Sequence, residues 1–147
     1  MKQDCPPLND NITKSMKSNK RKDTKPELLL RKELREAGFP GYRLQWDVPG
    51  RPDICYPGRR IAIFVNGCFW HRCPFCNLSA PKHNHDFWVD KFDNNVKRDE
   101  RNYETLKQLG WTVIVVWECE LKKQSISNTI QRIISIIGKS NQRTLRF

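Results

Sequence analysis

Two uninterrupted apolar runs set the strongest limit on the fold of this chain. IAIFV at residues 61–65 and WTVIVVW at residues 111–117 are rich in β-branched and aromatic side chains. Runs of this length without polar alternation are typical of strands that are buried on both faces of a sheet. Because such strands need covering layers, the two runs predict a central mixed β-sheet with helices packed on its faces.

Shorter patterns around these runs supply the remaining elements. Candidate caps and stopping glycines indicate helices, and the alternation of apolar residues indicates a half-buried strand. The expected elements are a helix from Thr24 to Gly38, strands at 42–48 and 53–56, a long amphipathic helix at 86–110 and a last helix at 128–138. The order is therefore helix, three strands, helix, strand, helix, which is an α/β fold.

The charge of the chain points to a polyanionic partner. Lys and Arg number 27 against 16 Asp and Glu, a net charge of +11. Nucleic acid suits this balance better than a membrane, since the sequence has no apolar run of transmembrane length and no signal-peptide pattern. A soluble protein that is merely basic is the simpler alternative. The absence of an export signal favours the reducing cytoplasm, where cysteines bind metals more often than they form disulfides.

The composition divides the chain into three parts. Residues 1–23 are polar and basic and are expected to form an arm that stays flexible until it meets DNA. Residues 24–138 are expected to form one compact domain that contains a cysteine-rich loop at 66–76. Residues 139–147 are expected to form a short basic tail.

The loop NGCFWHRCPFC at residues 66–76 predicts a metal centre. Its C-x₄-C-x₂-C spacing puts three thiols on one irregular segment, and a further cysteine follows the apolar run 111–117. Four sulfurs suit a closed, structural zinc site. The expected ligands are Cys68, Cys73, Cys76 and Cys119. A histidine (His71, His83 or His85) replacing one cysteine, or simple buried thiols, are the alternatives; Cys5 and Cys55 have no clustered partners and are expected to bind no metal.

Three further residues suggest chemistry near this loop. Asp53 follows a Pro-Gly turn where a strand begins, so it is placed either to bind a hard cation or simply to cap the turn. His71 lies between two expected zinc ligands, which would hold a general base rigidly unless the histidine is itself a ligand. Glu27 follows Thr24 by three residues, and this spacing also fits a reciprocal capping box.

Four ordered motifs together resemble a known family. GRPD (50–53), GCFWH (67–71), the FW and N-x-x-RD pattern (87–99) and LGWTVIVVWEC (109–119) are similar to the very-short-patch-repair, or Vsr, DNA mismatch endonucleases. The resemblance extends from about Met16 to Cys119. It implies a compact relative of the PD-(D/E)xK nuclease fold, acting as a monomer, that nicks one strand of double-stranded DNA beside a T·G mismatch. Mismatches of this kind arise when 5-methylcytosine deaminates.

The resemblance also implies roles for individual residues. Asp53 corresponds to the carboxylate that binds Mg²⁺, and the backbone carbonyl of Val65 corresponds to a second ligand. His71 corresponds to the base that activates the attacking water. Glu27 and Asp99 correspond to acidic residues that support the site, although an ion pair of Asp99 with a neighbouring arginine is the simple alternative.

Recognition of the mismatch is assigned in the same way. Phe69 and Trp70, together with Trp88, resemble an aromatic wedge that enters the DNA stack, and Met16 resembles an apolar residue inserted from the opposite groove. The four expected zinc ligands correspond to the structural zinc of the family. Other mismatch-repair proteins are possible partners, and the sequence leaves the nucleotide context of the mismatch open.

Two departures qualify these roles. Residues 54–66 contain no acidic residue, unlike standard PD-(D/E)xK nucleases, and this gap favours the Vsr family with its histidine chemistry. Asn66 stands where some members have a second histidine; it can hydrogen-bond a phosphate or a metal-bound water but cannot act as a base. The rival functions are a zinc-stabilised module that binds mismatched or bent DNA without cleavage, and a restriction-type nuclease acting on matched DNA.

Overall fold

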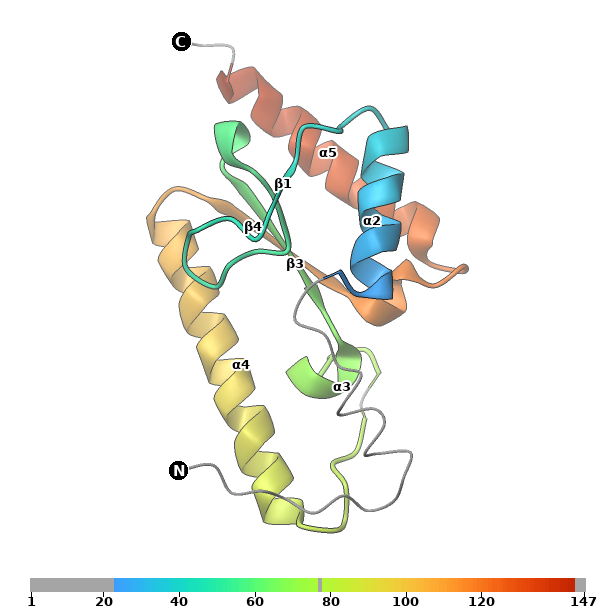
Figure 1. Ribbon diagram of the computed structural model, residues 1–147, viewed down its shortest axis with the longest axis vertical. Helices are drawn as coiled ribbons and strands as arrows, with labels where there is room; N and C mark the ends of the chain where they lie inside the picture. Colours follow the sequence, from blue (N-terminus) through green and yellow to red (C-terminus); the bar gives the residue numbers. More distant parts are fainter. Residues whose placement is uncertain (1–22, 77, 145–147) are drawn as a thin grey trace.

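The computed structural model describes residues 23–144 apart from residue 77, with side chains through residue 140. Its centre is a four-stranded sheet of order β1-β2-β3-β4 (Figure 1). β3 (Ile61–Asn66) pairs antiparallel with β2 (Ile54–Tyr56) and parallel with β4 (Thr112–Trp117). β1 (Arg43–Leu44) extends the sheet beyond β2. The two apolar runs are confirmed as neighbouring strands, and their carboxyl ends lie side by side because Asn66 pairs with Trp117.

Helices cover both faces of this sheet. α2 (Lys25–Glu36) and α5 (Ile126–Thr144) pack on one face, and α4 (His85–Gln108) packs on the other (Figure 1). In the sequence, α4 lies between β3 and β4. Alternation along β3 explains the two layers: Ile61 and Ile63 belong to the core under α2 and α5, whereas Ala62 and Phe64 pack with Leu106 of α4. The mixed α/β arrangement is confirmed.

The expected strand at 42–48 is wrong for most of its length. Only Arg43 and Leu44 pair with β2, and both are exposed. The chain leaves the sheet at Gln45, whose φ of 49° lies in the left-handed region, and it turns again at Gly50 with φ of 83°. Of the alternating apolar residues, Tyr42 and Val48 pack against the core, whereas Leu44 and Trp46 are exposed.

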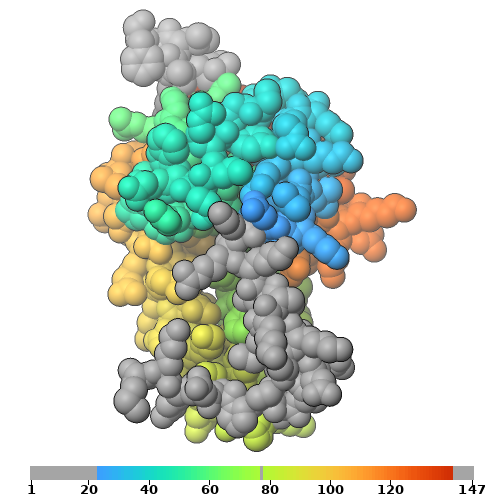
Figure 2. All heavy atoms as spheres, in the orientation of Figure 1, coloured from blue at the N-terminus to red at the C-terminus, as the bar shows by residue number. Residues whose placement is uncertain are grey.

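The loop before β2 packs closely against the sheet and α4. A Cβ atom at Gly50 would lie 3.1 Å from the Phe64 ring and from Cβ of Asn102, so only glycine fits both the left-handed backbone and this contact. Figure 2 shows the segment from α2 to β2, blue to green, as one continuous layer above the yellow surface of α4. This layer holds the start of β2 against the centre of the fold.

Two helices differ from the sequence prediction. α5 continues past Gly138 to Thr144, so it is longer than its isoleucine pattern indicated. A short helix that was not predicted, α3 (Cys68–His71), follows β3 within the cysteine-rich loop. Over the residues that the structure describes, no helix is long and apolar enough to span a membrane.

Candidate active site and metal centre

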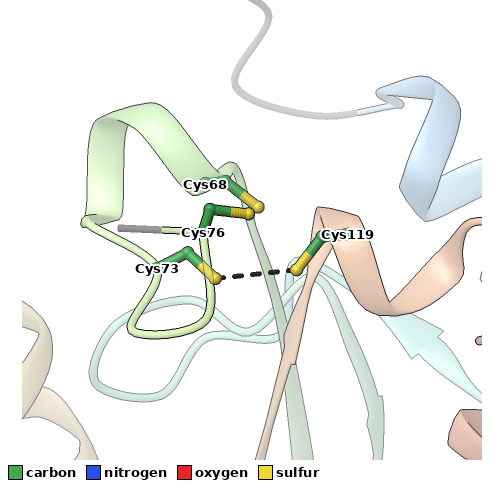
Figure 3. Close-up of side chains that lie close together, drawn as sticks. All are labelled: Cys68, Cys73, Cys76 and Cys119. Atoms are coloured by element: carbon green, nitrogen blue, oxygen red, sulfur yellow. Dashed lines mark hydrogen bonds between the residues drawn. The ribbon is translucent and has the colours of Figure 1, made fainter. Parts of the chain in front are cut away.

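Four cysteine sulfurs converge where β3 and β4 end. α3 and the loop after it carry three of them, and Cys119 lies in the 3₁₀ turn η2 (Glu118–Leu121) beyond β4. The four Sγ atoms all lie within 4.8 Å of one another, and those of Cys73 and Cys119 are 3.6 Å apart (Figure 3). Zinc–sulfur bonds of about 2.3 Å in a tetrahedron place sulfurs about 3.8 Å apart. The set Cys68, Cys73, Cys76 and Cys119 therefore has nearly the dimensions of a tetrahedral thiolate site.

The chemistry of these sulfurs also fits a bound cation. All five cysteines in the described residues are free thiols, and Cys55 lies apart from the cluster, in β2. Burial acts to raise the pKa of Cys73, but N–H groups of the following backbone donate to its sulfur and bring the pKa below its usual value. Burial raises the pKa of Cys119 to about 11 and raises that of Cys68 as well. A cation is what would let all four sulfurs ionise together.

A turn after α3 directs these cysteines toward one another. Arg72 adopts a left-handed φ of 57° and ends α3, which lets the Cys73 N–H donate to the Cys68 carbonyl at 3.0 Å. The Arg72 guanidinium lies 4.2 Å from the centre of the Phe92 ring in α4 and also hydrogen-bonds the Leu78 carbonyl. The cysteine-rich loop is thus fastened to α4 as well as to the sheet.

A second cluster of polar groups forms beside β3, around Asp53. One oxygen of Asp53, Oδ2, accepts a hydrogen bond of 2.7 Å from the backbone N–H of Val65. Burial raises the pKa of Asp53 to about 7; the Val65 N–H acts against this rise, and the nearby Glu27 carboxyl adds to it. Two carboxyl groups that share a desolvated position repel each other when both are ionised. Oxygen ligands of this kind, next to a strand backbone, fit a hard divalent cation.

The carboxylate of Glu27 is fixed from the side of α2. Its Oε2 accepts a hydrogen bond of 2.8 Å from the Asp23 N–H and lies 3.3 Å from Nη2 of Arg31, which is also 2.8 Å from Asp23. Thr24 caps the helix by accepting a hydrogen bond from the Glu27 N–H. The reciprocal capping box, which was the alternative role of Glu27, does not form, because Glu27 accepts from the Asp23 N–H instead of the Thr24 N–H. Glu27 is only 2% exposed, so these contacts hold its carboxyl group in the interior.

His71 pairs with Asp99 rather than with the cysteines. Nδ1 of His71 lies 2.5 Å from Oδ2 of Asp99 on α4, whereas Arg98 approaches Asp99 only to 4.0 Å. The side chain of His71 is 25% exposed, so part of it is accessible to solvent. A carboxylate at Nδ1 holds the imidazole as the tautomer that can accept a proton at Nε2. The metal cluster of the described residues contains no histidine, which leaves His71, His83 and His85 outside it.

Asn66 links the end of β3 to α4. Its Nδ2 donates to the hydroxyl of Tyr103 at 2.8 Å, and the side chain of Asn66 is buried. Tyr103 packs its ring on Phe64, with centroids 4.9 Å apart. The amide of Asn66 is thus committed to Tyr103, one residue beyond the strand position that binds Asp53.

The aromatic residues of the loop form a cluster against α4. The Phe69 ring lies 5.1 Å from Trp70, 5.8 Å from Trp88 and 5.1 Å from Phe92. Phe69 and Trp70 are half-buried, whereas Trp88 is only 4% exposed and lies beneath them. Asn95 fixes this arrangement by donating to the Trp70 carbonyl at 3.1 Å. Met16, the other residue expected to contact DNA, lies outside the described residues.

Sequence reasoning missed Gln45, Arg31 and Tyr103. Gln45 has a left-handed backbone, and its side-chain amide acts to lower the pKa of Asp53. Its buried Nε2 has no hydrogen-bond partner within the described part of the chain. Gln45 carried no recognisable signal because the segment resembled a strand. Arg31 and Tyr103 each lie one helical turn after an acidic site residue, Glu27 and Asp99, and that spacing was available in the sequence.

Comparison with known proteins decides the family. The family model described as DNA mismatch endonuclease Vsr matches residues 9–77. The DNA mismatch endonuclease Vsr of Escherichia coli strain K12 is 38% identical over 111 residues, which cover 75% of this chain and 70% of that protein. This chain belongs to the Vsr family. The type II nicking enzyme V.NmeAIP of Neisseria meningitidis is 43% identical over 71% of this chain and 75% of its own length. V.NaeI of Lentzea aerocolonigenes is 35% identical over 86% of this chain and 79% of its own length.

Family membership makes this Vsr-family protein a DNA endonuclease. The compared region includes both the segment around Asp53 and the loop that carries His71. The geometry adds what names alone do not give: Asp53 hydrogen-bonded to the Val65 N–H, a histidine–aspartate pair on α3 and α4, and a cluster of four cysteine sulfurs.

Proposed function

We propose that this protein nicks one strand of double-stranded DNA next to a T·G mismatch, using Mg²⁺ at Asp53 and structural zinc at the four cysteines. The observation that carries the proposal is the pairing of His71 with Asp99 at 2.5 Å. His71 follows the end of β3, and the Val65 N–H of that strand binds Asp53. A protein that only binds mismatched DNA needs neither group. A helix-flanked sheet with the acidic residue at the start of a strand also supports kinship with the PD-(D/E)xK nucleases.

The chain's own residues divide the work of hydrolysis. Asp53 and the Val65 carbonyl would hold Mg²⁺, which stabilises charge on the scissile phosphate and promotes ionisation of the attacking water. Nε2 of His71 takes the proton of that water while Asp99 holds Nδ1. Glu27, kept in place by Arg31, adds negative charge that favours a cation beside Asp53.

Recognition is proposed to use the basic surface and the aromatic cluster. The net charge of +11 supplies phosphate contacts whose strength falls with salt. Phe69 and Trp70, supported by the buried Trp88, would enter a base step that is already weak at the mismatch. The polar segment 1–23 is proposed as an arm and residues 139–147 as a tail around the nuclease domain at 24–138.

The direct test compares duplexes that differ at one base pair. Purified protein with Mg²⁺ is incubated with strand-labelled T·G and T·A duplexes in several sequence contexts. The proposal expects one nicked strand on T·G duplexes and little cutting of T·A. Equal cutting of both duplexes would favour the restriction-type function, and tight binding without any nick would favour the binding module.

Replacing Asp99 with asparagine should slow nicking roughly 10- to 1,000-fold while zinc content stays at the wild-type value, because the imidazole loses its orienting carboxylate. His71→Ala should slow nicking further and also keep its zinc. Single-turnover nicking rates and metal analysis measure both effects. Asp93→Asn is the matched control: Asp93 lies on the same helix, its ion pair with Lys97 is exposed, and it should change neither quantity. Loss of zinc from His71→Ala would contradict the base assignment.

The double variant Phe69→Ala, Trp70→Ala should lose the preference for T·G over T·A duplexes and keep its zinc. Its melting temperature should fall only moderately, because both rings are half-buried and the cluster retains Trp88 and Phe92. Competition nicking assays and thermal melts measure the two effects. Phe75→Ala is the control, since Phe75 is 68% exposed in the same loop. A variant that melts far lower but still discriminates would show that the two rings serve only the core.

A further inference from the structure

We infer that Tyr103 is an additional catalytic residue, whose hydroxyl donates a hydrogen bond to a non-bridging oxygen of the scissile phosphate. The inference rests on the proposed nicking function, and neither the sequence motifs nor the family comparison assigns this residue a role. Four observations lead to it: the helical position of Tyr103, the anchoring of its ring, the partner of its hydroxyl and the charges that surround it.

Tyr103 lies on the face of α4 that already carries one part of the site. It follows Asp99 by four residues, so the two side chains emerge one turn apart on the same side of the helix. Asp99 binds His71 at 2.5 Å. The aromatic ring of Tyr103 is fixed by Phe64 of β3, with 4.9 Å between ring centroids and 58° between planes. The hydroxyl therefore occupies a fixed position between α4 and the sheet.

The hydroxyl of Tyr103 has a proton to give. Asn66 donates to this oxygen at 2.8 Å, so the oxygen acts as an acceptor in that bond. Within residues 23–76 and 78–140, no group accepts the hydroxyl proton. Because Asn66 comes directly after Val65, whose N–H binds Asp53, the bond to Asn66 fixes the hydroxyl near the carboxylate cluster. A half-buried donor with no acceptor is available for a group that arrives with the substrate.

The carboxylates of both parts of the site lie near enough to this hydroxyl to act on it. Burial raises the pKa of Tyr103, and the carboxylates of Asp99 and Asp53 each raise it further. The hydroxyl thus keeps its proton and lies within the electrostatic reach of both carboxylates. Asp53 belongs to the cation half and Asp99 to the base half. A phosphate on which both halves act must lie between them, where a neutral donor can stabilise the charge that develops on its oxygens.

A structural role for Tyr103 is the competing explanation, and sulfur substitution separates the two. T·G duplexes are prepared with a single sulfur in place of either non-bridging oxygen at the scissile phosphate. Sulfur accepts hydrogen bonds poorly, so the wild-type enzyme should nick one diastereomer more slowly. Measurements in both Mg²⁺ and Mn²⁺ remove the part of this effect that a metal–oxygen contact causes.

Tyr103→Phe should slow single-turnover nicking of the all-oxygen duplex roughly 100-fold. For one diastereomer, the slowing caused by sulfur should largely disappear in this variant, because the lost hydrogen bond is the one that sulfur weakens. Tyr56→Phe is the matched control: the Tyr56 hydroxyl donates to the Phe39 carbonyl at 2.8 Å, away from the site, so the sulfur effects should stay as in wild type.

The outcomes distinguish this inference from the function on which it rests. If wild-type protein nicks T·G duplexes and Tyr103→Phe nicks them equally fast, the role of Tyr103 is wrong and the proposed function stands. If Tyr103→Phe is slow but both sulfur effects persist unchanged, the residue is structural and the inference is again wrong. If wild-type protein nicks no duplex at all, both the proposed function and this inference are wrong.

Discussion

Replacing Asp53 with asparagine should reduce Mg²⁺-dependent nicking by at least about 10³-fold and leave DNA binding nearly unchanged. The amide can still accept the hydrogen bond of the Val65 N–H, so the local backbone is preserved. It cannot supply the negative charge that a hard cation requires. Neutralising an acidic group does not weaken contacts with phosphates. Nicking rates and binding to mismatched duplexes, measured at equal salt concentration, test both parts.

The same substitution should make the protein more stable near neutral and alkaline pH when Mg²⁺ is absent. The pKa of Asp53 is raised from 3.8 to about 7, so the folded state holds a proton that the unfolded chain releases in this interval. Stability of the wild type therefore falls as pH rises from about 4 to 7, and the loss is complete above pH 7. Asparagine has no charge to bury beside Glu27, so the variant should exceed wild type at pH 8 by on the order of 1–4 kcal/mol.

Thermal or urea unfolding at pH 5 and pH 8 measures this difference, with Mg²⁺ omitted rather than chelated so that zinc stays bound. The gain should be larger at pH 8 than at pH 5. Asp47→Asn is the matched control, because Asp47 is an exposed aspartate in the loop before β2 and changes the net charge equally. An Asp53→Asn protein that nicks at the wild-type rate would contradict the catalytic role. A variant less stable than wild type at pH 8 would contradict the electrostatic argument.

The layered fold and the four-cysteine cluster follow from patterns that are local in the sequence. A continuous apolar run such as 61–65 can satisfy its environment only between two covering layers, and this is where β3 lies. The spacing of Cys68, Cys73 and Cys76 restricts them to one loop, and Cys119 joins them because β4 ends beside β3. Periodicity and spacing were therefore enough for these features.

Contacts between distant segments were beyond such patterns. The pairing of His71 with Asp99 depends on how α4 lies across the sheet, and the motif alone also allowed an ion pair with Arg98. The strand predicted at 42–48 ends early because the backbone turns at Gln45, and the loop that follows passes close to Phe64 and Asn102 at Gly50. The burial of Trp88 likewise arises from the packing of α3 on α4. Each of these outcomes is decided by tertiary packing, which a single sequence does not encode in any local period.

Replacing Cys119 with serine should remove the bound metal and unfold much of the protein. Purified wild type should contain about one zinc per chain, since the four sulfurs form one cluster. Cys119 is the expected ligand that ties the cysteine-rich loop to the end of β4, and the other three expected ligands lie within residues 68–76. Coupled binding and folding in structural zinc sites is worth on the order of 10 kcal/mol, as much as the whole stability of a domain of this size.

The damage from Cys119→Ser should spread from the metal to catalysis, because α3 carries both Cys68 and His71. Without the metal, the loop loses its hold on β4, and His71 can no longer be kept against Asp99. The zinc content, the melting temperature and the nicking rate should therefore all decrease together. Cys55→Ala is the matched control: Cys55 is buried in β2 and lies outside the cluster, so this variant should lose some stability but keep its zinc. A wild-type preparation that is free of zinc and still unfolds in one full cooperative transition would contradict the structural role of the metal.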